Sequence, residues 1–527
     1  MSDETSDLDE LRARRALTED AARPDAVRRR HDAGGRTARE NLADLVDEGS
    51  FVEYGRFAIA AQRGRRELQD LIERTPADGL IGGTARVDGS PCAVLSYDYT
   101  VLAGTQGALG HRKKDRLFEL IERMRLPTVF FAEGGGGRPG DTDYPVVSAL
   151  DTRAFALWAK LSGLVPRISI VAGRCFAGNA VIAGCSDLIV ATEHSSIGMG
   201  GPAMIAGGGL GDVAPDDVGP VDTQSRNGVV DVVAADEREA IALTKRLLSY
   251  FQGRREPGTA ADQTRLRSLV PERRRRAYRI EPIIETLADL DSVTFLRPRF
   301  APELATALGR IEGRAVGFIA NNTMHMAGAI TSDAGDKAAR FLQLCDGFGI
   351  PVISLVDTPG MMVGPDAEAT GLVRHTSRLL VAGAALRVPF VAVILRRGYG
   401  LGAQAMTAGS LHEPLLTVAW PSAHLGPMGL EGAVRLALRK ELDAIPDAEE
   451  RERRVRELTA AAQDNAKALN AAMLFELDDV IDPAQTRSLI ASTFAAADPV
   501  PARGQAEGQA EPRGQTEPRG HRFIDTW

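Results

Sequence analysis

Residues 165–180 read VPRISIVAGRCFAGNA, and residues 388–404 read VPFVAVILRRGYGLGAQ. In each stretch a Val-Pro pair precedes a run of β-branched residues, and the run ends in a turn of small residues. Proline lacks the N–H that the interior of a strand needs, so it suits the position just before a strand. The pattern predicts a buried strand, a tight turn and an Ala-rich helix, twice in one chain.

Another strand is predicted ahead of each of these two. It follows Pro127 in the first half and Pro351 in the second. The two prolines of a half lie 39 residues apart in the first half and 38 in the second. From the second proline to the turn is 11 residues at Ala177 and 12 at Leu401. Two copies of one β–loop–α–β–loop–α unit explain this spacing, with right-handed crossovers between parallel strands.

The same alternation of strand-like and helix-like runs extends over most of the chain. It indicates an α/β protein with two related domains. The expected parts are a flexible arm (1–25), a first domain (26–252), an interdomain segment (253–276), a second domain (277–497) and a low-complexity tail (498–527). The tail repeats Gly, Gln, Glu, Pro and Arg, a composition that cannot form a packed core.

Composition narrows the class of protein. The net charge of -8 argues against generic nucleic-acid binding, which needs a basic surface. Four scattered cysteines without a CxxC pair predict reduced thiols and no zinc site. The N-terminus lacks the apolar core of a signal peptide, and the most apolar stretch, 379–395, is broken by Arg387 and Pro389. We therefore expect a cytoplasmic protein with no metal in the chain.

The repeated turns can bind an anion through backbone alone. Glycine lets the backbone approach a ligand, and the first N–H groups of a helix have no intrahelical acceptor. In acyl chemistry this is an oxyanion hole, in which one donor is worth roughly 2.7–4 kcal/mol of barrier. The candidate donors are the amides of Ala177 and Gly178 in the first turn and of Leu401 and Gly402 in the second. Simple strand–helix junctions are the alternative, but two turns at matched places favour the functional interpretation.

Other catalytic patterns are weak. The sequence has no G-x-S-x-G elbow and no G-x-x-x-x-G-K-[ST] phosphate loop. The basic run His111-Arg112-Lys113-Lys114 could meet the phosphates of an acyl carrier or begin a solvated helix. An oxyanion hole without a protein nucleophile or base indicates that a bound partner supplies the base, and biotin fits that role.

Several motifs now resemble those of a known family, the carboxyltransferase subunits of biotin-dependent acyl-CoA carboxylases. The resemblance covers about residues 26–490. The matching motifs are Gly35-Arg36-Thr37-Ala38-Arg39-Glu40, Asp78-Gly79-Leu80-Ile81-Gly82-Gly83, Lys113-Lys114, Glu133 to Arg138, Asp336-Lys337-Ala338-Ala339-Arg340-Phe341, Val356-Asp357-Thr358-Pro359-Gly360, Tyr399-Gly400-Leu401-Gly402-Ala403, Met428 to Val434 and Ile524-Asp525-Thr526-Trp527.

The resemblance implies two tandem crotonase-like domains, the N-terminal one binding acyl-CoA and the C-terminal one binding biotin. Carboxybiotin would release CO2, the biotin ureido nitrogen would take the acyl α-proton, and the enolate would attack CO2. By analogy the thioester enolate lies at Leu401 and Gly402, and the ureido oxygen at the first pair. The implied substrate-binding residues are Lys113, Lys114, Gly135, Gly136, Ala403 and Gln404, of which Gln404 shapes the acyl pocket.

The resemblance also implies partners. The chain has no Met-Lys-Met biotinylation motif and no ATP-grasp-like region, so a separate biotin carboxylase and biotin carrier are expected. The active site would lie between the N-domain of one subunit and the C-domain of another, in a dimer or trimer of dimers.

Three rival interpretations stay open. One is a biotin-dependent decarboxylase or transcarboxylase of the same fold. Another is a degenerate acyl-CoA-binding scaffold, suggested by Ala177 and Thr323, where this sequence departs from the family. A crotonase-like hydratase or isomerase is the third, but neither turn carries a carboxylate.

Overall fold

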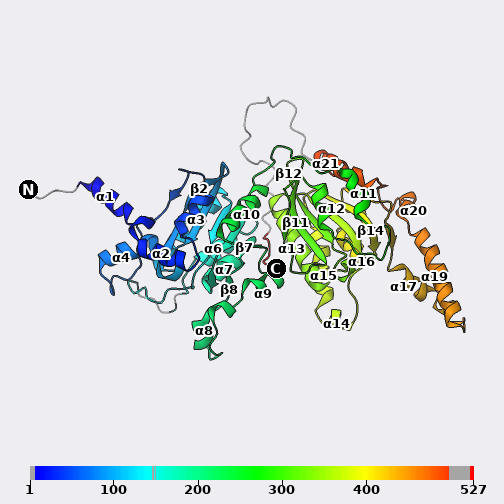
Figure 1. The fold of residues 1–527 in the computed structure, drawn as a ribbon, viewed down its shortest axis with the longest axis horizontal. Helices are drawn as coiled ribbons and strands as arrows, with labels where there is room; N and C mark the ends of the chain where they lie inside the picture. Colours follow the sequence, from blue (N-terminus) through cyan, green and yellow to red (C-terminus); the bar gives the residue numbers. More distant parts are fainter. Residues whose placement is uncertain (1–5, 145–147, 149, 498–522) are drawn as a thin grey trace, which may run out of the picture. The chain divides into compact units, whose positions relative to one another are not determined.

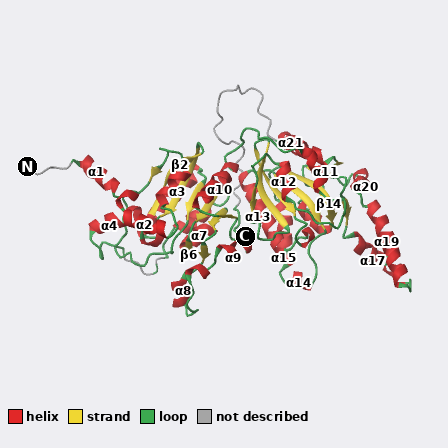
Figure 2. Cartoon of the chain, in the orientation of Figure 1, coloured by secondary structure: helices red, strands yellow, loops and turns green. Residues whose placement is uncertain are grey.

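The computed structural model describes residues 6–144, 148, 150–497 and 523–527. These residues divide into two compact units (Figure 1). The first contains the described residues up to Gln252 together with 523–526, and the second begins at Gly253. Each unit contains a mostly parallel β-sheet with helices packed on it (Figure 2). The predicted α/β class is confirmed.

The sheet of the first unit has the strand order β1-β2-β3-β4-β5-β7-β9. The strands are β1 (Val52–Glu53), β2 (Leu80–Val87), β3 (Ser90–Tyr97), β4 (Thr128–Phe131), β5 (Arg167–Val171), β7 (Leu188–Thr192) and β9 (Val232–Ala234), with a separate pair of β6 (Arg174–Phe176) and β8 (Ser196–Gly198). The helices are α1 (Asp7–Ala16), α2 (Pro24–Asp32), α3 (Ala38–Leu45), α4 (Leu68–Arg74), α5 (Ala108–Met124), α6 (Ala154–Lys160), α7 (Gly178–Gly184), α8 (Pro202–Gly207), α9 (Val221–Arg226) and α10 (Glu237–Tyr250).

The sheet of the second unit follows the same plan, in the order β10-β11-β12-β13-β14-β15-β17, with β16 paired to β14. Its strands are β10 (Thr294–Leu296), β11 (Leu304–Ile311), β12 (Arg314–Asn321), β13 (Val352–Thr358), β14 (Phe390–Tyr399), β15 (Leu416–Ala419), β16 (His424–Gly426) and β17 (Asp479–Val480). The helices are α11 (Leu266–Leu269), α12 (Glu281–Leu287), α13 (Ser332–Phe348), α14 (Pro365–Glu368), α15 (Leu372–Ala384), α16 (Gly400–Met406), α17 (Leu430–Ala437), α18 (Arg439–Asp443), α19 (Ala448–Asn465), α20 (Ala468–Met473) and α21 (Thr486–Ala496).

The prolines set the strand starts in both units. Strands β4, β5, β13 and β14 each begin at the residue after a predicted proline. The carbonyl of Pro166 accepts from Thr128 N (2.8 Å), and that of Pro389 accepts from Val352 N (2.9 Å). A residue that cannot donate thus accepts the first hydrogen bond from the neighbouring strand. The predicted strand starts are confirmed.

The repeat extends to a buried lysine. Lys113 Nζ donates to the carbonyls of Ala77 (3.0 Å) and Leu80. In the second unit Lys337 Nζ donates to Ala301 O (3.3 Å) and Leu304 O (2.7 Å), and also to Phe300 O (2.7 Å). Lys337, Ala301 and Leu304 each lie 224 positions after their counterparts in the first unit. Equivalent lysine ammonium groups therefore donate hydrogen bonds to equivalent loop carbonyls in the two copies.

Each unit has its own apolar core. In the first unit Phe118, Phe130 and Trp158 are buried, and ring centroids lie 4.9 Å apart for Phe118–Trp158 and 5.8 Å for Phe130–Trp158. In the second unit strands β12 to β15 contribute residues such as Phe318 and Val418 to one buried cluster, which also includes Trp420 just after β15. No helix among the residues described here is both long and apolar enough to cross a membrane.

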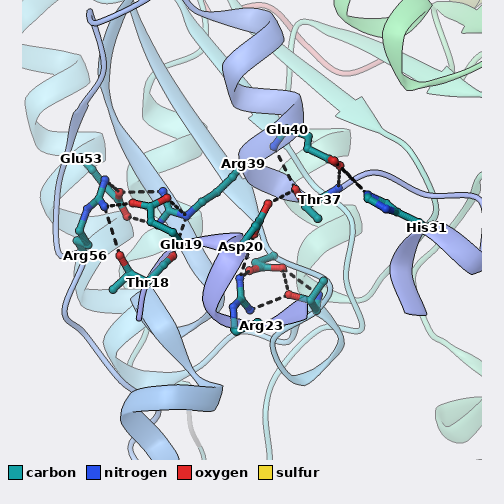
Figure 3. A network of polar contacts seen from close by, with 12 residues as sticks. Thr18, Glu19, Asp20, Arg23, His31, Thr37, Arg39, Glu40, Glu53 and Arg56 are labelled. Atoms are coloured by element: carbon teal, nitrogen blue, oxygen red, sulfur yellow. Dashed lines mark hydrogen bonds and ion pairs between the residues drawn. The ribbon is translucent and has the colours of Figure 1, made fainter. Parts of the chain in front are cut away.

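The N-terminal region differs from the flexible arm predicted for residues 1–25. Most of residues 7–25 are helical, and polar contacts attach residues 18–23 to the first unit (Figure 3). Arg23 forms an ion pair with buried Asp98 (2.9 Å), and Asp20 accepts from Thr37 Oγ1 (2.5 Å). Arg39 Nε donates to Thr18 O (2.8 Å). The charged composition that suggested an arm instead supplies these buried partners.

The proposed interdomain segment, 253–276, packs within the second unit. Leu266 is fully buried in its core, and Arg255 N donates to Gly313 O (3.0 Å). Of the predicted tail, 498–522 lies outside the described residues. Ile524 is buried in the first unit, where its N–H donates to Ser162 Oγ (2.9 Å).

Removing either buried lysine should destabilise its own unit. We expect Lys337→Met to lower the free energy of unfolding of the second unit by about 3 kcal/mol, because its buried carbonyls lose their donor. Lys113→Met should have a similar effect on the first unit. Denaturant unfolding followed by hydrogen exchange in each unit measures this; a loss below about 1 kcal/mol in both variants would contradict the assignment.

Candidate active site

The second turn joins β14 to α16 and depends on three glycines. Gly400 has φ +57°, a left-handed conformation that glycine adopts without strain. A Cβ added to Gly402 would lie 2.6 Å from the carbonyl carbon of Gly360 and 2.7 Å from its Cα. No side chain fits in that contact. The N–H groups of Leu401 and Gly402 lie in the first turn of α16, where no intrahelical acceptor is available.

A pocket of about 890 Å³ lies beside this turn, within the second unit. Leu401, Ala403 and Gln404 line it, so the structure brings three of the predicted residues together. Much of the remaining wall is apolar and includes Leu430 and Leu474. The Leu401 side chain is 62% exposed, and Gly402 itself is buried behind it.

A buried ionic cluster holds the two strands that lead into the site. The Asp357 carboxylate accepts from Arg396 Nε (2.9 Å), Arg397 Nε (2.6 Å) and the Tyr278 hydroxyl (2.8 Å). Burial, and then the neighbouring Asp357 charge, raise the pKa of Tyr278 well above its usual range. The cluster ties the end of β13 to the end of β14. Sequence reasoning noted Asp357 only as part of a motif, because its partners are distant in the chain.

The first turn joins β6 to α7, and here the structure corrects one predicted donor. The Ala177 N–H donates to Gly198 O (3.1 Å), so it is used within the fold. Ala177 also has φ +51° and ψ −123°, a conformation suited to glycine. Gly178, the first residue of α7, keeps its place at the helix start. Of the predicted pair, Gly178 is the candidate donor in this structure.

Strand pairing shifts the correspondence between the two turns by one residue. Phe176 pairs with Gly198 on β8, and Tyr399 pairs with Gly426 on β16. Ala177 therefore corresponds to Gly400, and both have positive φ. Both lie 11 residues after the proline that precedes the strand. The counterparts of Leu401 and Gly402 are thus Gly178 and Asn179, rather than Ala177 and Gly178.

The glycine-rich loop after β4 supports the first turn. Its amides are occupied: Gly134 N donates to Arg174 O (2.8 Å), Gly135 N to Ala103 O (3.3 Å) and Gly136 N to Asn179 Oδ1 (3.1 Å). Substrate binding by Gly135 and Gly136 stays a prediction, and these N–H groups already have acceptors.

Lys113 and Lys114 both point into the first unit. Lys114 Nζ donates to Tyr97 Oη (3.0 Å) and Gln106 Oε1 (2.5 Å) and is fully buried. Burial lowers the pKa of Lys114 to about 7 and that of Lys113 to about 8. Neither ammonium group lies on the surface of this structure. Their contact with a substrate phosphate stays a prediction.

Glu133 is a buried carboxylate of the glycine-rich loop that supports the first turn. It accepts two hydrogen bonds from Arg30, at 2.9 Å and 2.7 Å. Burial raises the pKa of Glu133, an effect that the Arg30 charge opposes. This bidentate pairing is poorly suited to a general base, which must release and accept a proton near the substrate. Among the described residues, no cluster of His, Cys, Asp and Glu has the arrangement of a metal site.

The chain is similar to known proteins in sequence and in structure. The profile of the carboxyl transferase domain matches residues 29–503. The propionyl-CoA carboxylase beta chain of Saccharopolyspora erythraea (strain ATCC 11635 / DSM 40517 / JCM 4748 / NBRC 13426 / NCIMB 8594 / NRRL 2338) is 34% identical over 493 residues, which cover 88% of each chain.

Two solved structures are also similar. A single-chain, multi-domain long-chain acyl-CoA carboxylase is 54% identical, with a TM-score of 0.89 over 93% of this chain. The present chain spans about half, 49%, of that larger protein. The transcarboxylase 12S structure is 31% identical, with a TM-score of 0.84 over 96% of this chain and 98% of that one.

Replacing Ala177 with glycine should relieve backbone strain. A non-glycine residue in this region costs about 1–3 kcal/mol, and the added freedom of the unfolded chain returns about 0.4–1 kcal/mol of that. We expect Ala177→Gly to stabilise the first unit by about 1 kcal/mol while keeping the turn. Denaturant unfolding checks this, and a variant less stable than the parent would contradict the strained geometry.

Proposed function

Because the chain belongs to the carboxyl transferase family and is an acyl-CoA carboxyltransferase, we propose that it moves a carboxyl group from carboxybiotin to the α carbon of an acyl-CoA. The resemblance found in the sequence motifs is confirmed at the level of family and reaction. We further assign the reacting residues, the acyl group and the partners.

The observation that carries the site assignment is the pair of matched backbone turns. Removing the α proton of an acyl-CoA places negative charge on the thioester oxygen. Amides that point at the developing charge stabilise it without reorganisation, each by roughly 2.7–4 kcal/mol. We assign this role to Leu401 and Gly402 in the second unit, with Gly178 and the N–H of Asn179 as the matching donors in the first. One pair holds the thioester oxygen and the other the ureido oxygen of biotin.

Neither turn supplies a proton acceptor of its own, since residues 177–181 and 399–404 contain no acidic side chain. When bound, carboxybiotin supplies both the carboxyl group and, once that group has left, the base. The pocket beside Leu401 suits the acyl part of the thioester that the second turn would hold. Its volume lies within the range of roughly 300–1,000 Å³ that is typical of ligand pockets. Leu401, whose N–H is one of the assigned donors, lines this largely apolar pocket.

The acyl group we favour is a long one. Gln404 and the surrounding leucines form an open, largely apolar wall that can take a chain longer than propionyl. The long-chain acyl-CoA carboxylase is also far more similar in sequence than the propionyl-CoA enzyme, 54% against 34%. The biotin carboxylase and biotin carrier would be separate partners, and the chain would assemble with copies of itself, as the 12S protein does in its hexamer.

A second candidate has its own support. The 12S protein is a transcarboxylase, and its structure holds methylmalonyl-CoA. The 12S protein is 31% identical over nearly the whole chain. We therefore keep as the alternative a transfer in which a carboxylated acyl-CoA donates the carboxyl group to another acceptor. The same turns would then stabilise the same enolate, because forward and reverse steps share one transition state.

The reaction can be tested with purified carboxylase and carrier partners. We expect ¹⁴C-bicarbonate to enter acyl-CoA in the presence of ATP, with long-chain acyl-CoA preferred over acetyl- and propionyl-CoA because of the apolar pocket. Carboxyl transfer only from methylmalonyl-CoA that carries ¹⁴C in its carboxyl group, without bicarbonate and ATP, would favour transcarboxylation. No transfer with any donor would favour the scaffold interpretation.

Gly402→Ala should reduce turnover by about 100- to 1,000-fold, because its Cβ forces the Leu401–Gly402 amides away from the reacting oxygen. Gly429→Ala is the matched control: an added Cβ there meets no atom within 4 Å, and φ is −55°. Steady-state rates of the two variants give the comparison. Equal rates would remove the assigned role from the second turn.

A further inference from the structure

Asn179 is a buried side chain that the proposed reaction does not itself use. Its Oδ1 accepts from Gly136 N (3.1 Å) and Gln106 Nε2 (3.0 Å). Its Nδ2 donates to Gly104 O and Glu133 O, both at 3.3 Å. The carboxamide is fully buried and uses all of its usual hydrogen-bonding positions. It links two loops to the first turn of α7.

Lys114 sets the direction of these bonds. An ammonium group can only donate, so Gln106 must turn its Oε1 toward Lys114. The Gln106 Nε2 then faces Asn179, which must present Oδ1 to it. Asn179 Nδ2 is left facing two backbone carbonyls, which can only accept. Lys114 at one end of this hydrogen-bonded series and the two backbone carbonyls at the other therefore require the same orientation of the Gln106 and Asn179 amides.

The loop that Asn179 holds has little freedom to rearrange. Gly134 has φ +156° and Gly136 has φ +86°. A Cβ on Gly134 would lie 2.2 Å from Gly104 O, and one on Gly136 would lie 2.7 Å from the Ala177 Cβ. The loop is thus pressed against both the preceding loop and the turn. Movement of Asn179 would be transmitted to the residue before it, Gly178.

In the second copy another buried amide, that of Asn321, links the corresponding loops: its Nδ2 donates to Gly328 O (3.2 Å) and its Oδ1 accepts from Asp357 N (3.1 Å). The Lys114–Gln106–Asn179 chain itself is not repeated there. The residues 224 positions after Gln106 and Lys114 are Ile330 and Ala338, which cannot take part in it. The counterpart of Asn179 by strand pairing is Gly402, which contacts the Gly360 backbone directly. At the position of Asn179 itself, the second copy has direct backbone contact through Gly402, and the first copy has hydrogen bonds of a side-chain amide.

We propose that Lys114, Gln106 and Asn179 are positioning residues that fix the Gly178 N–H for carboxyl transfer. The inference rests on the proposed function, since it concerns the oxyanion donor of that reaction. None of the three side chains touches the substrate in this scheme. They act through the loop 133–138 and the start of α7.

Asn179→Asp and Gln106→Glu test the relay because each keeps the shape of the side chain and removes a donor. A carboxylate at 179 cannot donate to Gly104 O and Glu133 O, and one at 106 cannot donate to Asn179. Glu at 106 would pair with Lys114, so this variant should still fold. We expect kcat to fall about 100-fold in each, with KM for acyl-CoA changed less than about 3-fold, because donor placement and not binding is lost.

Hydrogen–deuterium exchange gives a measurement that does not depend on turnover. Exchange of the segment 133–138 should accelerate in both variants and stay as in the parent enzyme in Lys337→Met. Lys337→Met removes an equally buried lysine that has no link to the relay. Its kcat per folded enzyme should match that of the parent.

The outcomes separate the two hypotheses. An inactive parent enzyme would count against the proposed function, whatever the exchange shows. An active parent with unchanged kcat in Asn179→Asp and Gln106→Glu would overturn the relay. So would a change confined to stability, in which loop exchange and kcat per folded enzyme stay at the parent values.

Discussion

The structure of each unit depends on one tightly packed junction, where the loop after one parallel strand meets the turn after the next. In the second unit the Gly402 Cα lies against the Gly360 backbone, with no room for a side chain. Parallel strands end at the same edge of a sheet, so their following loops must meet there. The proline carbonyls start β13 and β14 in register, and the Asp357 ionic cluster joins their ends. Both features serve to place two short loops within backbone contact.

The two copies solve this packing problem in different ways. Glycine permits direct contact in the second copy. In the first copy Asn179 fills the equivalent place and replaces contact with hydrogen bonds. A side-chain amide donates through its nitrogen and accepts through its oxygen, so each amide in the series must be turned one way. Lys114, which can only donate, sets the orientation of the first amide, Gln106. By contrast, the buried lysine below the loops, Lys113 or Lys337, is common to both copies. We therefore infer that Lys113 and Lys337 stabilise the fold that both copies share, whereas the Lys114–Gln106–Asn179 series serves the first turn alone.

An active site made of backbone amides has consequences for specificity. The donors assigned to the enolate are backbone N–H groups, so the side chains that line the pocket can change while the reacting groups stay the same. In this chain the side chains beside the second turn belong to the wall near Gln404. The chain is similar both to an enzyme named for propionyl-CoA and to one named for long-chain acyl-CoA. A departure such as Ala177 is tolerated, since its N–H is used elsewhere.

The sequence by itself determined the α/β class, the internal repeat, the strand starts and the family, because proline and glycine act on the local backbone and leave a readable spacing. It also located the second turn correctly. Only the tertiary structure decided the rest. The register of β6 with β8 shows that the counterpart of Leu401 is Gly178 and not Ala177. The side chains of Lys113 and Lys114 point into the interior of the first unit. The charged N-terminal residues are paired rather than loose, as Arg23 with Asp98 shows. These features depend on which distant residues meet, and hydrogen bonds between residues tens of positions apart leave no local pattern in the chain.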